Sequence, residues 1–164
     1  MKVSCVAFTC VLFFCITGYA AELTSRVVAI ADGDTVTVLD AQNVQHKIRL
    51  AGIDAPEKKQ PFGNRSKEAL SDCAFNKDVV INWDKIDRYQ RKVGKVIVAG
   101  VDCNLRQIDL GMAWHYKEYE KEQTPADRDS YAKAELQARS ARKGVWSDNE
   151  VIAPWVFRKA QKTK

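Results

Sequence analysis

Hydrophobic and polar residues alternate along most of the first half of the chain, and this period-two pattern predicts β-strands. Residues 35–39 read TVTVL, which places Val36 and Val38 on one side of a strand and polar residues on the other. A second β-branched run precedes them, and the Asp32-Gly33 pair between the two runs is a strong turn signal. Further apolar runs are bounded by turn residues in the same way. The predicted strands are 26–30, 35–39, 46–53, 79–83 and 93–98.

The apolar spacing becomes helical after the third predicted strand and again in the second half of the chain. Apolar residues recur there three and four positions apart, which predicts helices with one buried side. The last helix has the clearest ends, because Thr124-Pro125 is a capping residue followed by proline at the first helical position and Gly144 is a stop signal. The predicted helices are 66–76, 103–113 and 125–143.

Five short strands with a helix after the third favour an α+β fold, namely a five-stranded OB-type Greek-key β-barrel with three helices. No internal repeat or linker interrupts residues 21–164, so we expect them to form one domain. Residues 158–164 read RKAQKTK, and we expect a basic, mobile tail there.

The first 20 residues have the three-part pattern of a secretory signal peptide. Lys2 precedes a largely apolar stretch over residues 3–16, and Gly18 and Ala20 are small residues suited to a cleavage site. The alternative is a membrane anchor, but the stretch is shorter than the roughly 20 residues that span a bilayer. We therefore expect an exported protein, periplasmic or secreted, with no stable membrane association after cleavage.

Only two of the five cysteines, Cys73 and Cys103, lie outside this signal segment. In an exported protein such a pair favours a disulfide, and the alternative is two buried thiols that act as small apolar residues. Neither cysteine has a C-x-x-C partner or a nearby histidine, so a metal role is disfavoured.

The net charge of +5, from 26 Lys and Arg against 21 Asp and Glu, permits a polyanionic partner but does not require one. Tyr89, Tyr116 and Tyr119 are interleaved with basic residues, a pattern that suits single-stranded nucleic acid. The alternative is that these aromatics are core residues beside a solvated charged surface.

Acidic residues at strand ends and two arginines are the main candidates for chemistry. Asp34, Asp54 and Glu57 offer the hard oxygen atoms that Ca²⁺ and Mg²⁺ prefer, although Asp is also common in turns for local hydrogen bonds. Arg49 and Arg91 could bind phosphate oxygens with two guanidinium nitrogens each, or could be surface charges or members of structural ion pairs. No Ser-His-Asp or Cys-His arrangement is evident, which excludes most hydrolases that use a protein nucleophile.

Three motifs in one order give these candidates a family resemblance. The motifs are DGDT at 32–35, RLAGIDAPE at 49–57 and DRYQR at 87–91. Together they resemble the staphylococcal nuclease (thermonuclease) family, and the resemblance runs from about residue 27 to residue 155.

The resemblance implies an OB-type barrel and a Ca²⁺-dependent phosphodiesterase that hydrolyses DNA and RNA, prefers single strands and has little sequence specificity. By motif position, the side chains of Asp34 and Asp54 and the carbonyl of Ala55 would bind calcium. Glu57 matches the general base. A monomer is the expected state.

The resemblance also assigns the substrate contacts. Arg49 and Arg91 match phosphate-binding arginines that act in catalysis, and Tyr89 matches a tyrosine that contacts the nucleotide. The base-stacking aromatics fall at Tyr116 and Tyr119. A catalytically inert OB-type module that only binds nucleic acid is the alternative function, but the five catalytic positions are all filled here by the expected residue types.

Overall fold

The computed structural model describes residues 21–162, and the predicted signal peptide lies outside them. The strands are β1 (Ala21–Ile30), β2 (Thr35–Leu39), β3 (Gln45–Leu50), β4 (Ile53–Asp54), β5 (Asp78–Ile86), β6 (Lys92–Val98), β7 (Val101–Asp102) and β8 (Trp114–His115). The α-helices are α1 (Gly63–Ala74), α2 (Cys103–Asp109), α3 (Pro125–Ser140) and α4 (Pro154–Lys162), and short 3₁₀ helices cover Lys117–Glu122 and Gly144–Ser147.

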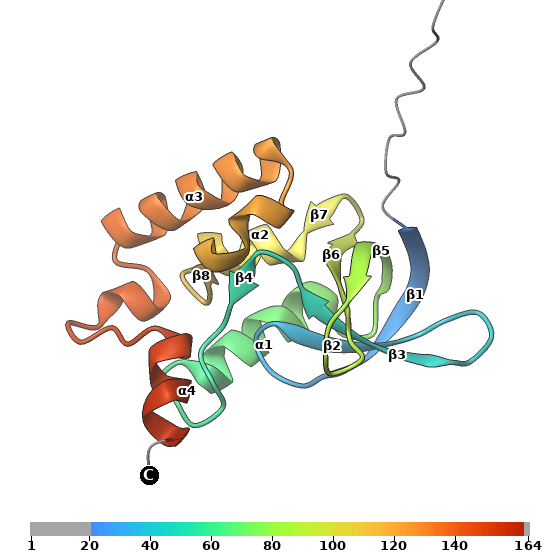
Figure 1. Ribbon diagram of the computed structural model, residues 1–164, viewed down its shortest axis with the longest axis horizontal. Helices are drawn as coiled ribbons and strands as arrows, with labels where there is room; N and C mark the ends of the chain where they lie inside the picture. Colours follow the sequence, from blue (N-terminus) through green and yellow to red (C-terminus); the bar gives the residue numbers. More distant parts are fainter. Residues whose placement is uncertain (1–20, 163–164) are drawn as a thin grey trace, which may run out of the picture.

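Five strands close into a barrel, which confirms the predicted fold. Strand β1 pairs antiparallel with β2 on one side and with β5 on the other. Strand β2 pairs antiparallel with β3, and β5 pairs antiparallel with β6. The barrel closes because β3 also pairs with β6, in parallel. Figure 1 shows this barrel on the right and the helices α2, α3 and α4 on the left.

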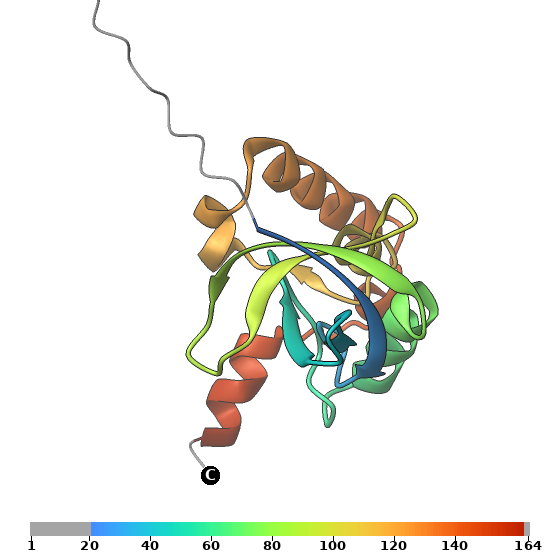
Figure 2. The same cartoon turned by 90° about the vertical axis from the view of Figure 1, so that its right-hand side faces the viewer.

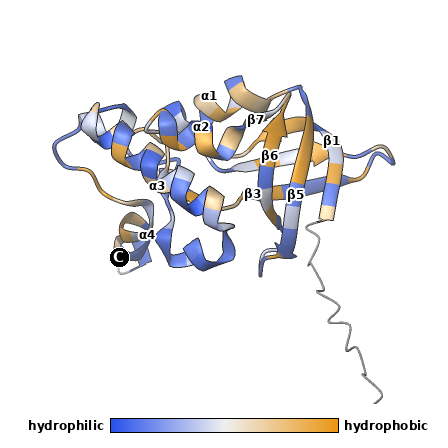
Figure 3. Cartoon of the chain, turned by 90° about the horizontal axis from the view of Figure 1, so that it is seen from above, coloured by the Kyte–Doolittle hydropathy of each residue, from blue (hydrophilic) through white to orange (hydrophobic). Residues whose placement is uncertain are grey.

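The alternating residues that predict the strands fill the barrel. Val36, Val38, Ile48 and Leu50 are all buried, and Leu70 of α1 packs into the same core. Strands β5 and β6 are hydrophobic toward the end where Val80 and Ile81 pair with Ile97 and Val96, and more hydrophilic toward the other end (Figure 3). Burial of such side chains stabilises the fold by about 1.5–3 kcal/mol each, so this core fixes the strand ends that carry the polar candidates.

The third strand is shorter than its apolar pattern suggests. It ends at Leu50, and Ala51 and Gly52 form a turn in which Gly52 has a φ of +72°, a conformation that favours glycine. After this turn Ile53 and Asp54 form the separate strand β4, which pairs with β8. The turn therefore moves Asp54 off the barrel wall and onto a small second sheet.

The C-terminal segment departs most from the sequence-based expectation. Residues 154–162 form helix α4, so the prediction of a mobile tail from residue 158 is wrong as far as Lys162. Figure 2 shows α4 projecting from the body of the molecule. Trp155 anchors the helix, because its ring stacks on Tyr116 at 5.4 Å and meets the edge of Trp114 at 6.4 Å.

A disulfide joins the end of α1 to the start of α2. Cys73 and Cys103 are bonded, and both residues are buried in the hydrophobic core. The bridge closes a loop of 30 residues, within which lie β5, β6 and β7. A cross-link of this length restricts the unfolded chain and so favours the folded state.

Replacing both cysteines by alanine should lower the free energy of unfolding by about 3–4 kcal/mol, the loop entropy expected for this span. Urea unfolding followed by tryptophan fluorescence measures the loss. The oxidised parent protein and the same protein in reductant are the two references, and the reduced parent should resemble the double variant. An unchanged midpoint in the variant would contradict a stabilising role for the bridge.

Candidate active site

Two buried carboxylates meet where β2 begins and β4 ends. Asp34 and Asp54 are 7 % and 1 % exposed. The backbone N–H of Ala55 donates to the Asp34 side chain at 2.7 Å, and the Leu50 N–H donates to the Asp34 carbonyl at 2.8 Å. The turn before β2 is therefore fixed directly against the chain that carries Asp54.

A buried hydrogen-bond network supports this turn from the helix side. The Gln107 amide of α2 donates to the carbonyl oxygens of Gly33 and Ser66, at 2.7 and 2.9 Å. A Cβ atom on Gly33 would lie 1.8 Å from the Ser66 hydroxyl oxygen, so only glycine permits this approach. The network sets the position of the neighbouring Asp34.

Arg49 joins the two carboxylates. It lies on the side of β3 opposite the buried Ile48, and the β2–β3 register pairs it with Thr35, next to Asp34. One guanidinium nitrogen lies 3.0 Å from an Asp34 oxygen, and the other donates to Asp54 at 3.0 Å. Because both acids contact one guanidinium, their oxygens converge on the same place.

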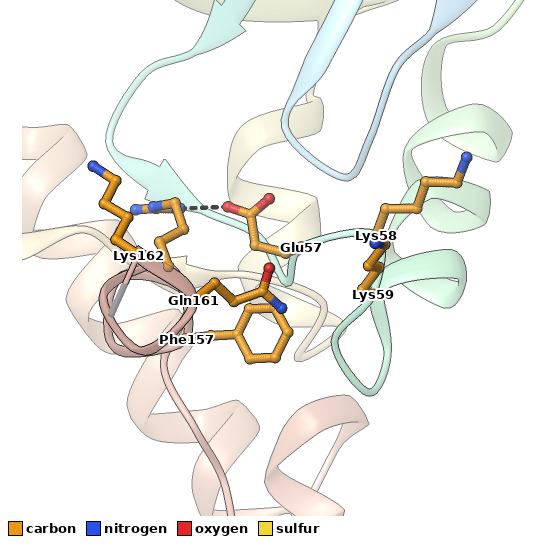
Figure 4. A pocket seen from close by; sticks show the side chains of 7 residues that line it. Glu57, Lys58, Lys59, Phe157, Gln161 and Lys162 are labelled. Carbon is orange, nitrogen blue, oxygen red and sulfur yellow. Dashed lines mark hydrogen bonds and ion pairs between the residues drawn. The ribbon is translucent and has the colours of Figure 1, made fainter. Parts of the chain in front are cut away.

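Arg158 of α4 is a further member of the site, and sequence reasoning missed it. It donates twice to Asp54, at 3.1 and 2.7 Å, and once to Glu57, at 2.8 Å. The dashed line in Figure 4 marks the contact at Glu57. A signal was present in the sequence: Pro154 suits a first helical turn, and Lys159 and Lys162 suit the last turn of a helix.

Burial raises the pKa of two acids at this site, Asp32 and Asp54. Asp32 shows the effect most clearly, since burial and repulsion from Asp34 raise its pKa to about 6. Burial also raises the pKa of Asp54, although Arg158 and Arg49 oppose the shift. Contacts with Asp54 and Glu57 in turn raise the pKa of Arg158. A cluster whose negative charge is removed from water in this way attracts cations.

Arg91 lies at the rim and does not contact the carboxylates in this structure. It pairs with Asp87 at 2.7 Å, and its nearest link to the site is a 3.4 Å contact with the Thr35 hydroxyl. That hydroxyl donates to Asp34 at 3.1 Å. Arg91 lies just before β6 and is therefore separated by one residue, Thr35, from the acidic cluster formed by Asp34, Asp54 and Glu57.

The three predicted nucleotide-contacting tyrosines fall in two places. Tyr89 is 63 % exposed and lies beside Arg91, whose guanidinium carbon is 5.4 Å from the ring centre. Tyr116 instead stacks on Trp155, and Tyr119 meets the edge of Tyr116 at 5.1 Å. One face of Tyr116 is thus covered by α4, whereas Tyr89 is open to a ligand.

The oxygen donors at this site suit a hard divalent cation. Within residues 21–162, no group of three or more His, Cys, Asp and Glu side chains is arranged to hold a metal. Ca²⁺ also accepts backbone carbonyls and water, so the convergent carboxylates of Asp34 and Asp54 with the neighbouring Ala55 carbonyl fit such an ion. Arg158 would have to release oxygens of Asp54 as the ion binds.

Comparison with known proteins identifies the family. The model of the staphylococcal nuclease homologue family matches residues 47–148. An "Uncharacterized endonuclease" of Haemophilus influenzae is 42 % identical over 139 residues, 85 % of this chain and 75 % of that protein. A "Micrococcal nuclease" of Shigella flexneri is 39 % identical over 152 residues, 87 % of this chain and 84 % of that protein.

This chain belongs to the staphylococcal nuclease family. The family match contains Arg49, Asp54, Glu57 and Arg91, and it ends before α4. The match thus contains Asp54 and Glu57, whereas Asp34 precedes it and Arg158 follows it.

Replacing Arg158 by glutamine should destabilise the metal-free protein. Hydrogen bonds between charged groups contribute about 1.5–3 kcal/mol, and since this arginine is half-buried we expect the free energy of unfolding to fall by about 2 kcal/mol. Urea unfolding in chelator measures the change. Arg106→Gln on the exposed side of α2 is the matched control, with an expected change within about 0.5 kcal/mol. Equal losses in the two variants would show that the Arg158 contacts contribute nothing.

Proposed function

We propose that this protein is a Ca²⁺-dependent nuclease that hydrolyses phosphodiester bonds of DNA and RNA, prefers single strands and has little sequence specificity. The observation that carries this proposal is the convergence of Asp34 and Asp54 on Arg49, beside Glu57. Buried carboxylates, a partly exposed carboxylate and an arginine lie together there. Membership of the staphylococcal nuclease family and relatives named as nucleases support the same conclusion.

Arg49 and Arg91 are the groups suited to bind the phosphate that is cut. A guanidinium presents paired N–H donors that match phosphate oxygens and keeps its charge at any physiological pH. Negative charge grows on those oxygens as water adds to phosphorus, so fixed cations stabilise the transition state more than the ground state. Arg49 is held by two acids and Arg91 by Asp87, which fixes both guanidinium groups in advance.

Glu57 is the candidate general base. Its side chain is 39 % exposed, so water can reach it, and Arg158 holds one of its oxygens. The carboxylate takes a proton from the attacking water as the water oxygen bonds to phosphorus; the bond from phosphorus to the leaving oxygen breaks, and that oxygen takes up a proton from solvent. A calcium ion bound at Asp34, Asp54 and the Ala55 carbonyl would supply positive charge to a phosphate oxygen and acidify bound water.

The proposal includes export and a monomeric state. The signal-peptide pattern at residues 1–20 supports a periplasmic or secreted enzyme. Among residues 21–162, no helix is long and apolar enough to cross a bilayer. Such an enzyme would meet DNA and RNA outside the cytoplasm.

Single-stranded DNA should be degraded in the presence of Ca²⁺ and left intact when a chelator is added. A gel assay with both conditions, followed by restoration with excess Ca²⁺, provides the test. Degradation that is indifferent to chelator would contradict the calcium mechanism. Binding without degradation under any condition would favour the inert nucleic-acid-binding module.

Replacing Glu57 by glutamine should preserve Ca²⁺ and DNA binding but lower turnover by about 10²–10⁴-fold, because the amide keeps the shape of the side chain and cannot accept the water proton. Calorimetric Ca²⁺ titration and single-turnover cleavage measure the two properties separately. Glu68→Gln, on the exposed side of α1, is the matched control. Near-parental turnover in Glu57→Gln would refute the assignment of this residue.

A further inference from the structure

A cavity of about 280 Å³ opens beside the active site, between α4 and the loop that follows β4. Lys58 and Lys59 line it from the loop, Phe157 and Lys162 from α4, and Glu57 and Arg158 border it as well. In Figure 4, Lys58 and Lys59 lie on one side, Lys162 on the other, and Phe157 and Glu57 between them. The cavity thus adjoins the proposed general base.

Contacts far apart in the sequence hold both walls in place. The Gln60 side chain, in the same loop as the two lysines, donates a hydrogen bond to the carbonyl of Ile152, just before α4. Trp155 fastens the first turn of α4 by stacking on Tyr116. The cavity is therefore a built feature of the fold, since each wall is tied to a residue outside it.

The cavity carries positive charge in addition to that of Arg158, which is paired with the acids of the active site. The guanidinium of Arg158 is engaged by Asp54 and Glu57. Three lysines remain, and their side chains are exposed to solvent. Phe157 adds an aromatic ring between them. A positive groove with an aromatic surface is the arrangement that binds single-stranded nucleic acid without regard to sequence.

We propose that this cavity is a phosphate-binding subsite for the nucleic-acid strand, next to the bond that is cut. Lys58 or Lys59 would contact the backbone from one wall and Lys162 from the other, and Phe157 would lie against the sugar or base. The α4 wall of this subsite lies outside the staphylococcal nuclease match at 47–148. The subsite rests on the proposed nuclease function and adds to it a second place where the strand is held.

The test compares two double variants with equal loss of charge. Lys58→Gln with Lys162→Gln removes one lysine from each wall, and Lys133→Gln with Lys143→Gln removes two exposed lysines of α3 and the turn after it. Binding of fluorescein-labelled oligothymidylates of two and eight nucleotides is followed by anisotropy in chelator, so that no strand is cut. Equal thermal unfolding midpoints would show that both variants fold.

The cavity variant should bind the eight-nucleotide strand roughly tenfold more weakly than the parent at 0.1 M salt. The slope of log K against log salt should fall in magnitude by about 1.4, since each phosphate contact with a single strand contributes about 0.7. The control variant should stay close to the parent. The difference between the variants should shrink for the two-nucleotide strand, whose single internucleotide phosphate cannot occupy both the active site and the cavity.

The outcomes separate this subsite from the proposed function. A parent protein that neither binds nor cuts single strands would overturn both together. A parent that cuts with Ca²⁺, while the cavity variant matches the control in affinity and in salt slope, would overturn the subsite alone.

Discussion

The burial of two carboxylates at one end of the barrel is the constraint on which the rest of this structure depends. Taking an ionised carboxylate out of water costs several kcal/mol unless opposite charge and hydrogen bonds offset it. Here Arg49 contacts both Asp34 and Asp54, and Asp34 also accepts from the Ala55 N–H. These contacts need β2 and β3 in fixed register and β4 beside them. Closure of the barrel by the β3–β6 pairing holds that register, so the core and the polar site stabilise each other.

The same constraint links stability to the proposed chemistry. Arg49, which balances both Asp34 and Asp54 in the metal-free protein, is also one of the two arginines suited to receive phosphate. When those carboxylates bind a divalent cation, less of their charge remains for Arg49, and its guanidinium group becomes available to substrate. An arginine that exchanges partners in this way needs no large movement of the backbone. Under the proposed function, charge balance alone therefore links metal binding to the availability of the arginine for phosphate.

Local patterns predict the parts of this fold that local forces determine. The alternation at Val36 and Val38 predicts β2, and Thr124 with Pro125 predicts the start of α3, where the Thr124 side chain accepts from the Asp127 N–H. The apolar run through residue 53 does not reveal the break at Gly52, because that turn depends on tertiary contacts. The roles assigned to Asp34, Asp54 and Glu57 come from resemblance, whereas Arg158 lies beyond the matched domain and has no motif to mark it.

Helix α4 shows why local sequence patterns do not predict the remaining part of the site. A helix of nine residues is too short to be stable alone in water, so its sequence resembles a basic tail. Its order comes from Trp155 against Tyr116 and Trp114, and from the Gln60 bond to Ile152. These contacts also bring Arg158 to the acidic cluster and shape the lysine-lined cavity beside it. Because the helix has little stability of its own, weakening the Trp155 contact would both release Arg158 and open the cavity. Helix α4 therefore contributes to the arginine contacts and to the cavity as one unit.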